Sequence, residues 1–349
     1  MQREGRLLIL DAIRGLAALL VAAFHFLKYN RLGAFPGYLA VDLFFVLSGL
    51  VIVLSYQSRL EHGLSVGDFM VLRLERLYPL WLLGCLVALV PVVMSGAAVA
   101  APRWLAGLTL ASLLMLPSPS PHYLFALNVP GWSLFFELVI NCAFAAGAWR
   151  LGDRALAALA GFCALLLVLA ASPPHFLDVG ADWPTFWWGF PRAGFSFVVG
   201  VLIWRTGVTR RRRTTWLALI PVILAVAAIV WPTPPAWRAA SDLVRVFALC
   251  PLIVLMGAKW ECTAPLTGIC ERLGALSYPI YVLHLPLLIL GIALHQGRAL
   301  GPGWLAPYLA GTVILAWPAA AADSVVRRWI RRKLARLRAG RLADDPIST

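Results

Sequence analysis

The sequence is poor in charge. Only 13% of its 349 residues are Asp, Glu, Lys or Arg, whereas 61% are hydrophobic, and the mean hydropathy is +0.82. A soluble domain of this length would need far more charge to cover its surface. Apolar runs of about 20 residues, the length that a helix needs to cross the hydrocarbon core, recur from end to end. Because a β-barrel would show short alternating segments instead, the sequence predicts an all-α, polytopic transmembrane bundle.

Cysteine is also scarce, and its spacing is uninformative. The six cysteines include no CxxC pair, and four of them (Cys85, Cys142, Cys163 and Cys250) lie inside apolar segments. Such residues behave as small buried apolar side chains rather than as a disulfide framework or a metal site. No metal cofactor is predicted.

Three common catalytic motifs are missing. The chain has no GxSxG elbow, no GxGxxG loop and no HExxH helix, so hydrolase, dinucleotide-binding and zinc-protease interpretations lack support. The pair Ser48-Gly49 is typical of close helix packing rather than of a nucleophile. At the N-terminus, Arg3 and Arg6 precede an apolar run, as in a signal peptide. That run is too long and too charged for one, so it predicts a retained first span.

The apolar segments predict about ten spans with both termini in the cytoplasm. This arrangement keeps the arginine-rich loops inside, as the positive-inside rule requires. The short run 104–116 is then an outer-surface or re-entrant piece, because an eleventh span would export the arginine clusters. We expect one transmembrane domain, 1–326, followed by a basic cytoplasmic tail, 327–349. The predicted spans are 7–27, 38–56, 77–95, 133–149, 155–171, 189–205, 215–231, 243–258, 277–295 and 303–323.

The formal net charge of +14 comes from arginines beside apolar helices, chiefly at 210–213 and 327–341. This placement orients a membrane protein and favours anionic lipid headgroups. Membrane lipid is therefore an expected partner, and nucleic acid is not.

Ionisable residues inside predicted spans are costly and thus mark functional positions. Arg14 and His25 are about 20° apart around the first helix and about 16 Å apart along it. The predicted topology brings His25 together with Asp42, Glu137 and Arg192 near the outer side. Histidine beside carboxylates is suited to general-base chemistry. The structural alternatives are an Arg14–Asp11 pair and an interhelical ion pair of Glu137 with Arg192.

A second group lies toward the cytoplasm. Arg73 and Arg76, at i and i+3, point the same way and have the geometry to clamp phosphates. Taken alone, they are more typical of interfacial arginines beside an aromatic belt formed by Tyr78 and Trp81. Tyr281 and His284 share a helical face in the same way, and an interhelical hydrogen-bond pair is their plain interpretation.

The chain resembles the acyltransferase-3 family of bacterial integral membrane O-acyltransferases over almost its whole length. A single matching motif would be weak evidence for this resemblance, whereas six motifs in the same order as in the family are specific evidence. The matching stretches are LDAIRGLAALLVAAFHF, VDLFFVLSGLVI, FMVLRLERLYPLW, WSLFFE, PRAGFSFVVG and LSYPIYVLHLP.

The resemblance implies a fold of about ten spans. It also implies an acyl-CoA donor, which in the family is usually acetyl-CoA, and a hydroxyl acceptor on a glycan or glycoconjugate. It makes His25 the main catalytic residue, with Arg14 contributing, and assigns Arg73 and Arg76 to donor recognition. We add Asp42 and Glu137 as catalytic residues. The remaining expectations are donor contacts at Tyr281 and His284 and substrate contacts at Arg192 and Trp132.

Two departures from the family pattern matter. Asn141 and Cys142 stand where many members carry an aromatic residue after the glutamate, and no esterase-like domain follows the basic tail. The prediction is thus an acyl-CoA-dependent O-acyltransferase of the bacterial inner membrane, with the oligomeric state open and a homo-oligomer included. The competing classes are a transporter or exporter of a saccharide or lipid-linked substrate, and a non-catalytic membrane subunit.

Overall fold

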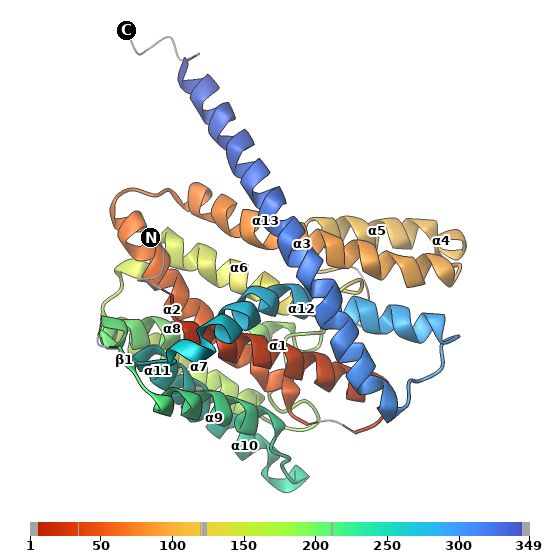
Figure 1. Ribbon diagram of the computed structural model, residues 1–349, viewed down its shortest axis with the longest axis horizontal. Coiled ribbons are helices and arrows are strands. Elements are labelled where there is room, and N and C mark those ends of the chain that lie inside the picture. The colour runs from red at the N-terminus through yellow and green to blue at the C-terminus, as the bar shows by residue number, and fades with distance from the viewer. Residues whose placement is uncertain (1–5, 34, 119, 121–123, 211, 344–349) are drawn as a thin grey trace.

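The computed structural model describes residues 6–33, 35–118, 120, 124–210 and 212–343, and it is built from helices (Figure 1). Two short strands, β1 (Arg213–Thr214) and β2 (Trp260–Glu261), pair in parallel and join two loops. A π-helical turn, Arg245–Leu249, connects helix α10 (Arg238–Val244) to helix α11 (Cys250–Lys259). The α-helices are α1 (Leu8–Tyr29), α2 (Ala40–Glu61), α3 (Val66–Met94), α4 (Ala97–Ala100), α5 (Pro102–Leu113), α6 (Gly131–Ala146), α7 (Asp153–Ala170), α8 (Gly189–Arg205), α9 (Leu219–Val230), α10 (Arg238–Val244), α11 (Cys250–Lys259), α12 (Thr267–Leu294) and α13 (Leu305–Ala343).

The predicted polytopic bundle is confirmed. In the described part of the chain, eight helices are long and apolar enough to cross a membrane, and two shorter apolar helices, Gly131–Ala146 and Trp216–Val230, complete the set. Each coincides with one of the ten predicted spans. The chain is therefore a multi-pass membrane protein.

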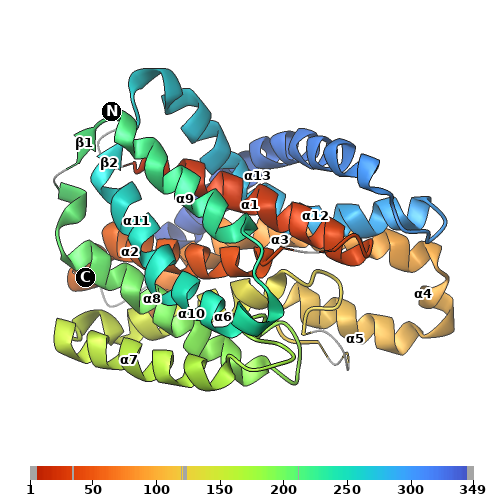
Figure 2. The same cartoon turned by 90° about the horizontal axis from the view of Figure 1, so that it is seen from below.

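The short run 104–116 forms α5, and its position decides between the two expectations for it. After α3 ends, α4 reverses the chain and α5 returns alongside α3 (Figures 1 and 2). Near the end of α5, the Ser112 carbonyl accepts a hydrogen bond of 2.7 Å from the Trp81 indole of α3. The segment is thus re-entrant, reaching the middle of α3 rather than lying on the outer surface.

The connection from α5 to α6 is buried as well, and a proline in α12 explains one of the hydrogen bonds that this connection makes. Pro286 cannot donate a backbone hydrogen bond, so the carbonyl of Val282, four residues earlier, loses its helical partner. The Asn128 side chain donates to that carbonyl at 3.0 Å. Inside a membrane protein such a freed group needs a partner, and a residue of the connection supplies it.

Glycines bring two helix pairs into close contact. A Cβ at Gly15 of α1 would lie 2.6 Å from Leu273 of α12, and a Cβ at Gly49 of α2 would collide with the Phe197 carbonyl of α8. Such close approach drives helix association in lipid, where apolar burial gives no advantage. The expected packing role of Gly49 is therefore confirmed.

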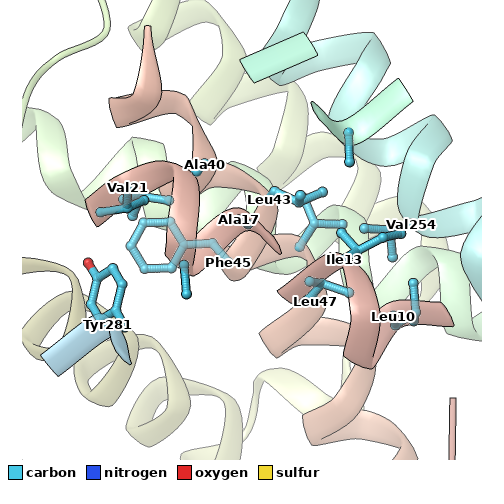
Figure 3. Packing of buried hydrophobic residues seen from close by; sticks show 14 of the residues in the cluster. Leu10, Ile13, Ala17, Val21, Ala40, Leu43, Phe45, Leu47, Val254 and Tyr281 are labelled. Atoms are coloured by element: carbon cyan, nitrogen blue, oxygen red, sulfur yellow. The ribbon is translucent and has the colours of Figure 1, made fainter. Parts of the chain in front are cut away.

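The core forms where these helices meet. Figure 3 shows Leu10 and Ile13 of α1 near Leu43 of α2 and Val254 of α11, with Val21 of α1 at the other end of the view beside Ala40 and Phe45 of α2. All of these side chains are nearly inaccessible. Branched aliphatic residues from three helices thus fix the frame on which the polar residues stand.

The last helix runs well beyond the bundle. With 39 residues α13 is about 58 Å long, nearly twice the thickness of a hydrocarbon core of about 30 Å. Its far part carries arginines, and Arg331 is bound to Glu75 of α3. The helix passes through the predicted boundary at 326/327 without a break. Residues 344–349 of the predicted tail lie outside the described residues.

Candidate active site

His25 and His284 face each other from α1 and α12. Their nearest nitrogens, His25 Nδ1 and His284 Nε2, are 3.1 Å apart, and the ring centroids are 5.0 Å apart. The two helices touch at Gly15 and Leu273, and each histidine lies ten or eleven residues further along its helix. Because both helices cross in the same direction, this equal spacing places the two rings at the same height.

The hydrogen bonds of the pair define the tautomers of the neutral rings. His284 Nδ1 lies 2.7 Å from the Tyr281 carbonyl and 3.2 Å from that of Ile280. Since a carbonyl only accepts, His284 Nδ1 carries the hydrogen and its Nε2 accepts one. His25 Nδ1 is then the donor, toward His284 Nε2 and the Val21 carbonyl at 3.0 Å. The lone pair of His25 therefore resides on Nε2, which has no hydrogen-bond partner among the described residues.

Asp42 and Arg192 do not join the histidines; they form a separate ion pair. Arg192 Nη2 lies 2.8 Å from the Asp42 carboxylate, and both side chains are fully inaccessible. The guanidinium also donates to the carbonyls of Val179 and Tyr38, each at 2.8 Å, and lies over the Trp132 ring. Each guanidinium nitrogen has an acceptor, so in this structure the pair ties α2 to α8 and an outer loop.

Glu137 lies beside Arg73, among the residues that were predicted to lie toward the cytoplasm. Glu137 Oε1 is 2.6 Å from Arg73 Nη2 and accepts a hydrogen bond from the Ser48 hydroxyl at 2.8 Å. The prediction that His25, Asp42, Glu137 and Arg192 form one outer cluster is therefore wrong. The reason is that α5 and the connection after it re-enter, so α6 begins beside Trp81 of α3 instead of at the outer surface. Six residues further on, Glu137 reaches Arg73.

A narrow cavity of about 90 Å³ opens between α1, α2, α3, α6 and α12. Three arginines line it, and Glu137 is the only carboxylate among its lining residues. Tyr281 lines it as well, one helical turn before His284. The arginines are Arg14, Arg73 and Arg76.

Two of these arginines, Arg14 and Arg76, are poorly neutralised, whereas Arg73 is paired with Glu137. Arg14 Nη1 is 3.8 Å from Asp11, which Arg6 approaches more closely at 2.5 Å. Arg73 has a buried Nε without a partner, and Arg76 has no hydrogen bond or ion pair within the described residues. Burying a guanidinium without a partner is costly. The cavity is therefore prepared for an anionic ligand.

The structure adds one pair that sequence reasoning missed. Ser133 Oγ and the Tyr281 hydroxyl are 2.7 Å apart, and both line the cavity. Ser133 stands next to Trp132 in the WSLFFE stretch, so its motif was the available signal. Among the described residues no group of three or more His, Cys, Asp or Glu side chains is arranged to hold a metal ion.

Two curated proteins are similar to this chain. Acyltransferase MdmB of Streptomyces mycarofaciens is 28% identical over an alignment of 385 positions, which covers 99% of this chain and 97% of the relative. "Protein 2 in picA locus" of Rhizobium radiobacter is 35% identical over 182 residues, which is 48% of this chain and 95% of the relative. No solved structure matches. The profile of a family described as an acyltransferase domain matches residues 7–321, so this chain belongs to the acyltransferase-3 family of membrane acyltransferases.

Proposed function

We propose that the protein moves an acyl group, acetyl in the first instance, from acyl-CoA to a hydroxyl of a glycan or glycoconjugate at the bacterial inner membrane. The observation that carries this proposal is the nearness of an arginine-lined cavity to the histidine pair. The cavity reaches Tyr281, which lies one helical turn before His284, and His284 Nε2 is 3.1 Å from His25 Nδ1; neither histidine lines the cavity itself.

Donor binding rests on the charge of the cavity. Arg14, Arg73 and Arg76 face one carboxylate, Glu137, so two positive charges are left for a ligand. Guanidinium groups bind phosphate bidentately, and CoA is rich in phosphate. A volume of about 90 Å³ is the space of roughly three water molecules, so it suits a short acyl group but not a nucleotide. The nucleotide thus stays at the cytoplasmic mouth while the thioester reaches Tyr281.

Catalysis rests on the free nitrogen of His25. Its Nε2 takes the proton from the acceptor hydroxyl as the hydroxyl oxygen bonds to the thioester carbon. The Ser133–Tyr281 hydroxyl pair or an arginine stabilises the resulting oxyanion. When the carbon–sulfur bond breaks, the same His25 proton passes to the CoA sulfur. His284 holds the His25 ring in the required tautomer.

A covalent variant uses the same residues. His25 Nε2 then attacks the thioester itself, releases CoA and passes the acyl group to the acceptor in a second step. The two routes differ in one observable: only the covalent route releases one equivalent of CoA per protein when no acceptor is present.

The test follows radiolabelled acetyl from acetyl-CoA into glycan in membranes that contain wild-type protein or the His25→Ala variant. Label in glycan with wild type and none with His25→Ala is expected. The matched control is His295→Ala, because His295 is an exposed histidine beyond α12 and its loss should change nothing.

Equal labelling with both proteins would remove His25 from the mechanism. Absence of any labelling, together with no CoA binding by the purified protein, would reject the acyl-CoA proposal and favour the transporter class. Transfer that persists with a longer acyl-CoA but not with acetyl-CoA would correct the donor alone.

A further inference from the structure

A second cavity lies on the opposite side of the molecule from the basic tail. Its volume is about 240 Å³, and its walls come from the ends of α1 and α9, the start of α10 and two loops. The predicted topology places all of these segments on the outer side. Phe24 and Lys28 of α1 line the cavity, whereas none of the ten predicted site residues does.

Two buried residues in the wall of this cavity, Asp242 and Arg245, each have a polar atom without a hydrogen bond among the described residues. Asp242 is fully inaccessible and Arg245 is 4% exposed. Asp242 Oδ1 and Arg245 Nη1 have no hydrogen bond among the described residues, and they lie 4.0 Å apart. Because buried polar groups are almost always hydrogen-bonded, this loosely paired aspartate and arginine mark the part of the wall where a further hydroxyl would be stabilised.

The rest of each side chain is held firmly. Asp242 Oδ2 accepts from the Tyr38 hydroxyl at 2.7 Å. Arg245 Nη2 donates to the Trp231 carbonyl at 2.6 Å and to the Thr233 hydroxyl at 3.0 Å. The free atoms are thus preorganised, and a hydroxyl, which both donates and accepts, can bridge them.

The backbone at Arg245 is unusual in a way that often marks function. The turn Arg245–Leu249 is π-helical, and such turns occur frequently at functional sites.

The rim mixes both signs of charge with apolar rings. Lys28 lies 3.1 Å from Asp178, and Arg238 donates to the Tyr38 hydroxyl at 3.2 Å while lying over the Phe176 ring. Each rim cation already has a partner, which disfavours a simple anion. Donors, acceptors and apolar walls together suit a hydroxylated ring. The volume lies below the roughly 300–1,000 Å³ of drug-sized pockets, which favours a single ring.

We propose that this cavity binds one sugar residue of the acceptor, next to the residue that is acylated. The inference rests on the proposed function for the presence of a glycan acceptor. Phe24, which lines the cavity, packs edge-on against the His25 ring with centroids 5.0 Å apart. A glycan held here brings its neighbouring unit toward His25.

The experiment measures sugar binding directly, without acyl transfer. Purified full-length protein in nanodiscs is titrated with methyl glycosides of glucose, galactose, mannose, rhamnose and N-acetylglucosamine and followed by saturation-transfer difference NMR. Saturable binding of at least one glycoside is expected, and the Asp242→Asn variant should weaken it about tenfold, since one hydrogen bond to a charged group is lost.

The matched control is Asp323→Asn. Asp323 is also a buried aspartate with one unpartnered carboxylate oxygen, but it lies on α13 outside the cavity. Its substitution should leave the sugar affinity unchanged. An unchanged elution volume in size-exclusion chromatography and an unchanged thermal unfolding midpoint show that each variant is folded. If Asp242→Asn does not accumulate, the exposed rim variant Lys28→Gln is used, with an expected loss of about threefold.

Absence of saturable binding by all five glycosides, or equal affinity in wild type and the cavity variant, would overturn the sugar subsite. These outcomes are distinguishable from failure of the proposed function. Sugar binding that depends on Asp242 in a protein without acyl transfer would leave the subsite standing, whereas transfer without Asp242-dependent binding would leave only the enzyme activity.

Discussion

At the scale of single residues, partner choice decides what each ionisable group can do. Asp42 and Glu137 are both carboxylates in spans, yet each is bound to an arginine, Arg192 and Arg73 respectively. His25 instead has a histidine partner, and one of its ring nitrogens is free. A general base must be neutral and correctly oriented, so a donor–acceptor chain through His284 serves it without a nearby carboxylate.

In the proposed mechanism, His284 is a positioning residue for His25. We expect His284→Ala to lower kcat by one to two orders of magnitude and to leave the KM for acyl-CoA within about twofold, because the donor site is elsewhere. His284→Gln, whose carbonyl oxygen can accept from His25 Nδ1, should recover part of the rate. A purely structural role would instead lower the amount of folded protein and would not be rescued selectively in kcat.

At the scale of helices, close contacts at glycine set which residues meet. The α2–α8 pair is held by Gly49 against the Phe197 carbonyl and by Gly200 against that of Val46. The same two helices carry Asp42 and Arg192, one to two turns earlier. The close approach therefore allows a short, fully buried ion pair between them.

Gly49→Ala should destabilise the protein by about 1–3 kcal/mol or more, because the added methyl group would collide with backbone that cannot move alone. The expected result is a lower midpoint of thermal unfolding in detergent. Gly161→Ala is the matched control, since Gly161 lies within α7 with no atom within 4 Å of the added Cβ. A midpoint equal for both variants would contradict the packing argument.

The bond between Asn128 and Val282 couples the re-entrant connection to α12. Asn128→Ala should cost about 1–3 kcal/mol, because the carbonyl freed by Pro286 is left buried without a donor. In the double variant Asn128→Ala/Pro286→Ala, the helix can supply its own donor, so the cost should be less than the sum of the two single changes. A strictly additive double-mutant cycle, measured by thermal unfolding, would refute this coupling.

At the scale of the whole molecule, the arginine-rich segments and the long last helix predict how the protein is oriented across the membrane. The long α13 projects from the bundle on one side (Figure 1). The Arg331–Glu75 pair joins its basic part to α3, whereas the cavity of the proposed sugar site is built from other segments, near the ends of α1 and α9. In the proposed mechanism, a donor from the cytoplasm and an acceptor from the outer side approach His25 from opposite directions.

This orientation is testable by labelling. In a background without native cysteines, a Gln296→Cys variant should react with a membrane-impermeant maleimide in intact spheroplasts, because the loop after α12 is on the outer side. An Arg210→Cys variant should react only after permeabilisation. Both positions are exposed in the structure. The reverse pattern would invert the topology and with it the proposed entry routes of donor and acceptor.

The sequence by itself determined the number of apolar spans and their approximate limits, and it predicts the orientation. These properties depend on local apolar length and on the arginines of the loops, which the chain displays directly. The spacing of Arg73 and Arg76 likewise determined that both line one cavity, because i and i+3 share a helical face. Motif order identified the family.

Only the tertiary structure decided which ionisable side chains contact one another. The sequence could not place Glu137 beside Arg73, since that depends on α5 and a buried connection that shift where α6 begins. Nor could it join His25 to His284, which are 259 positions apart and meet because α1 and α12 approach at Gly15. Helix formation is a local property in a membrane, whereas the choice among similar apolar faces depends on packing and on interhelical hydrogen bonds.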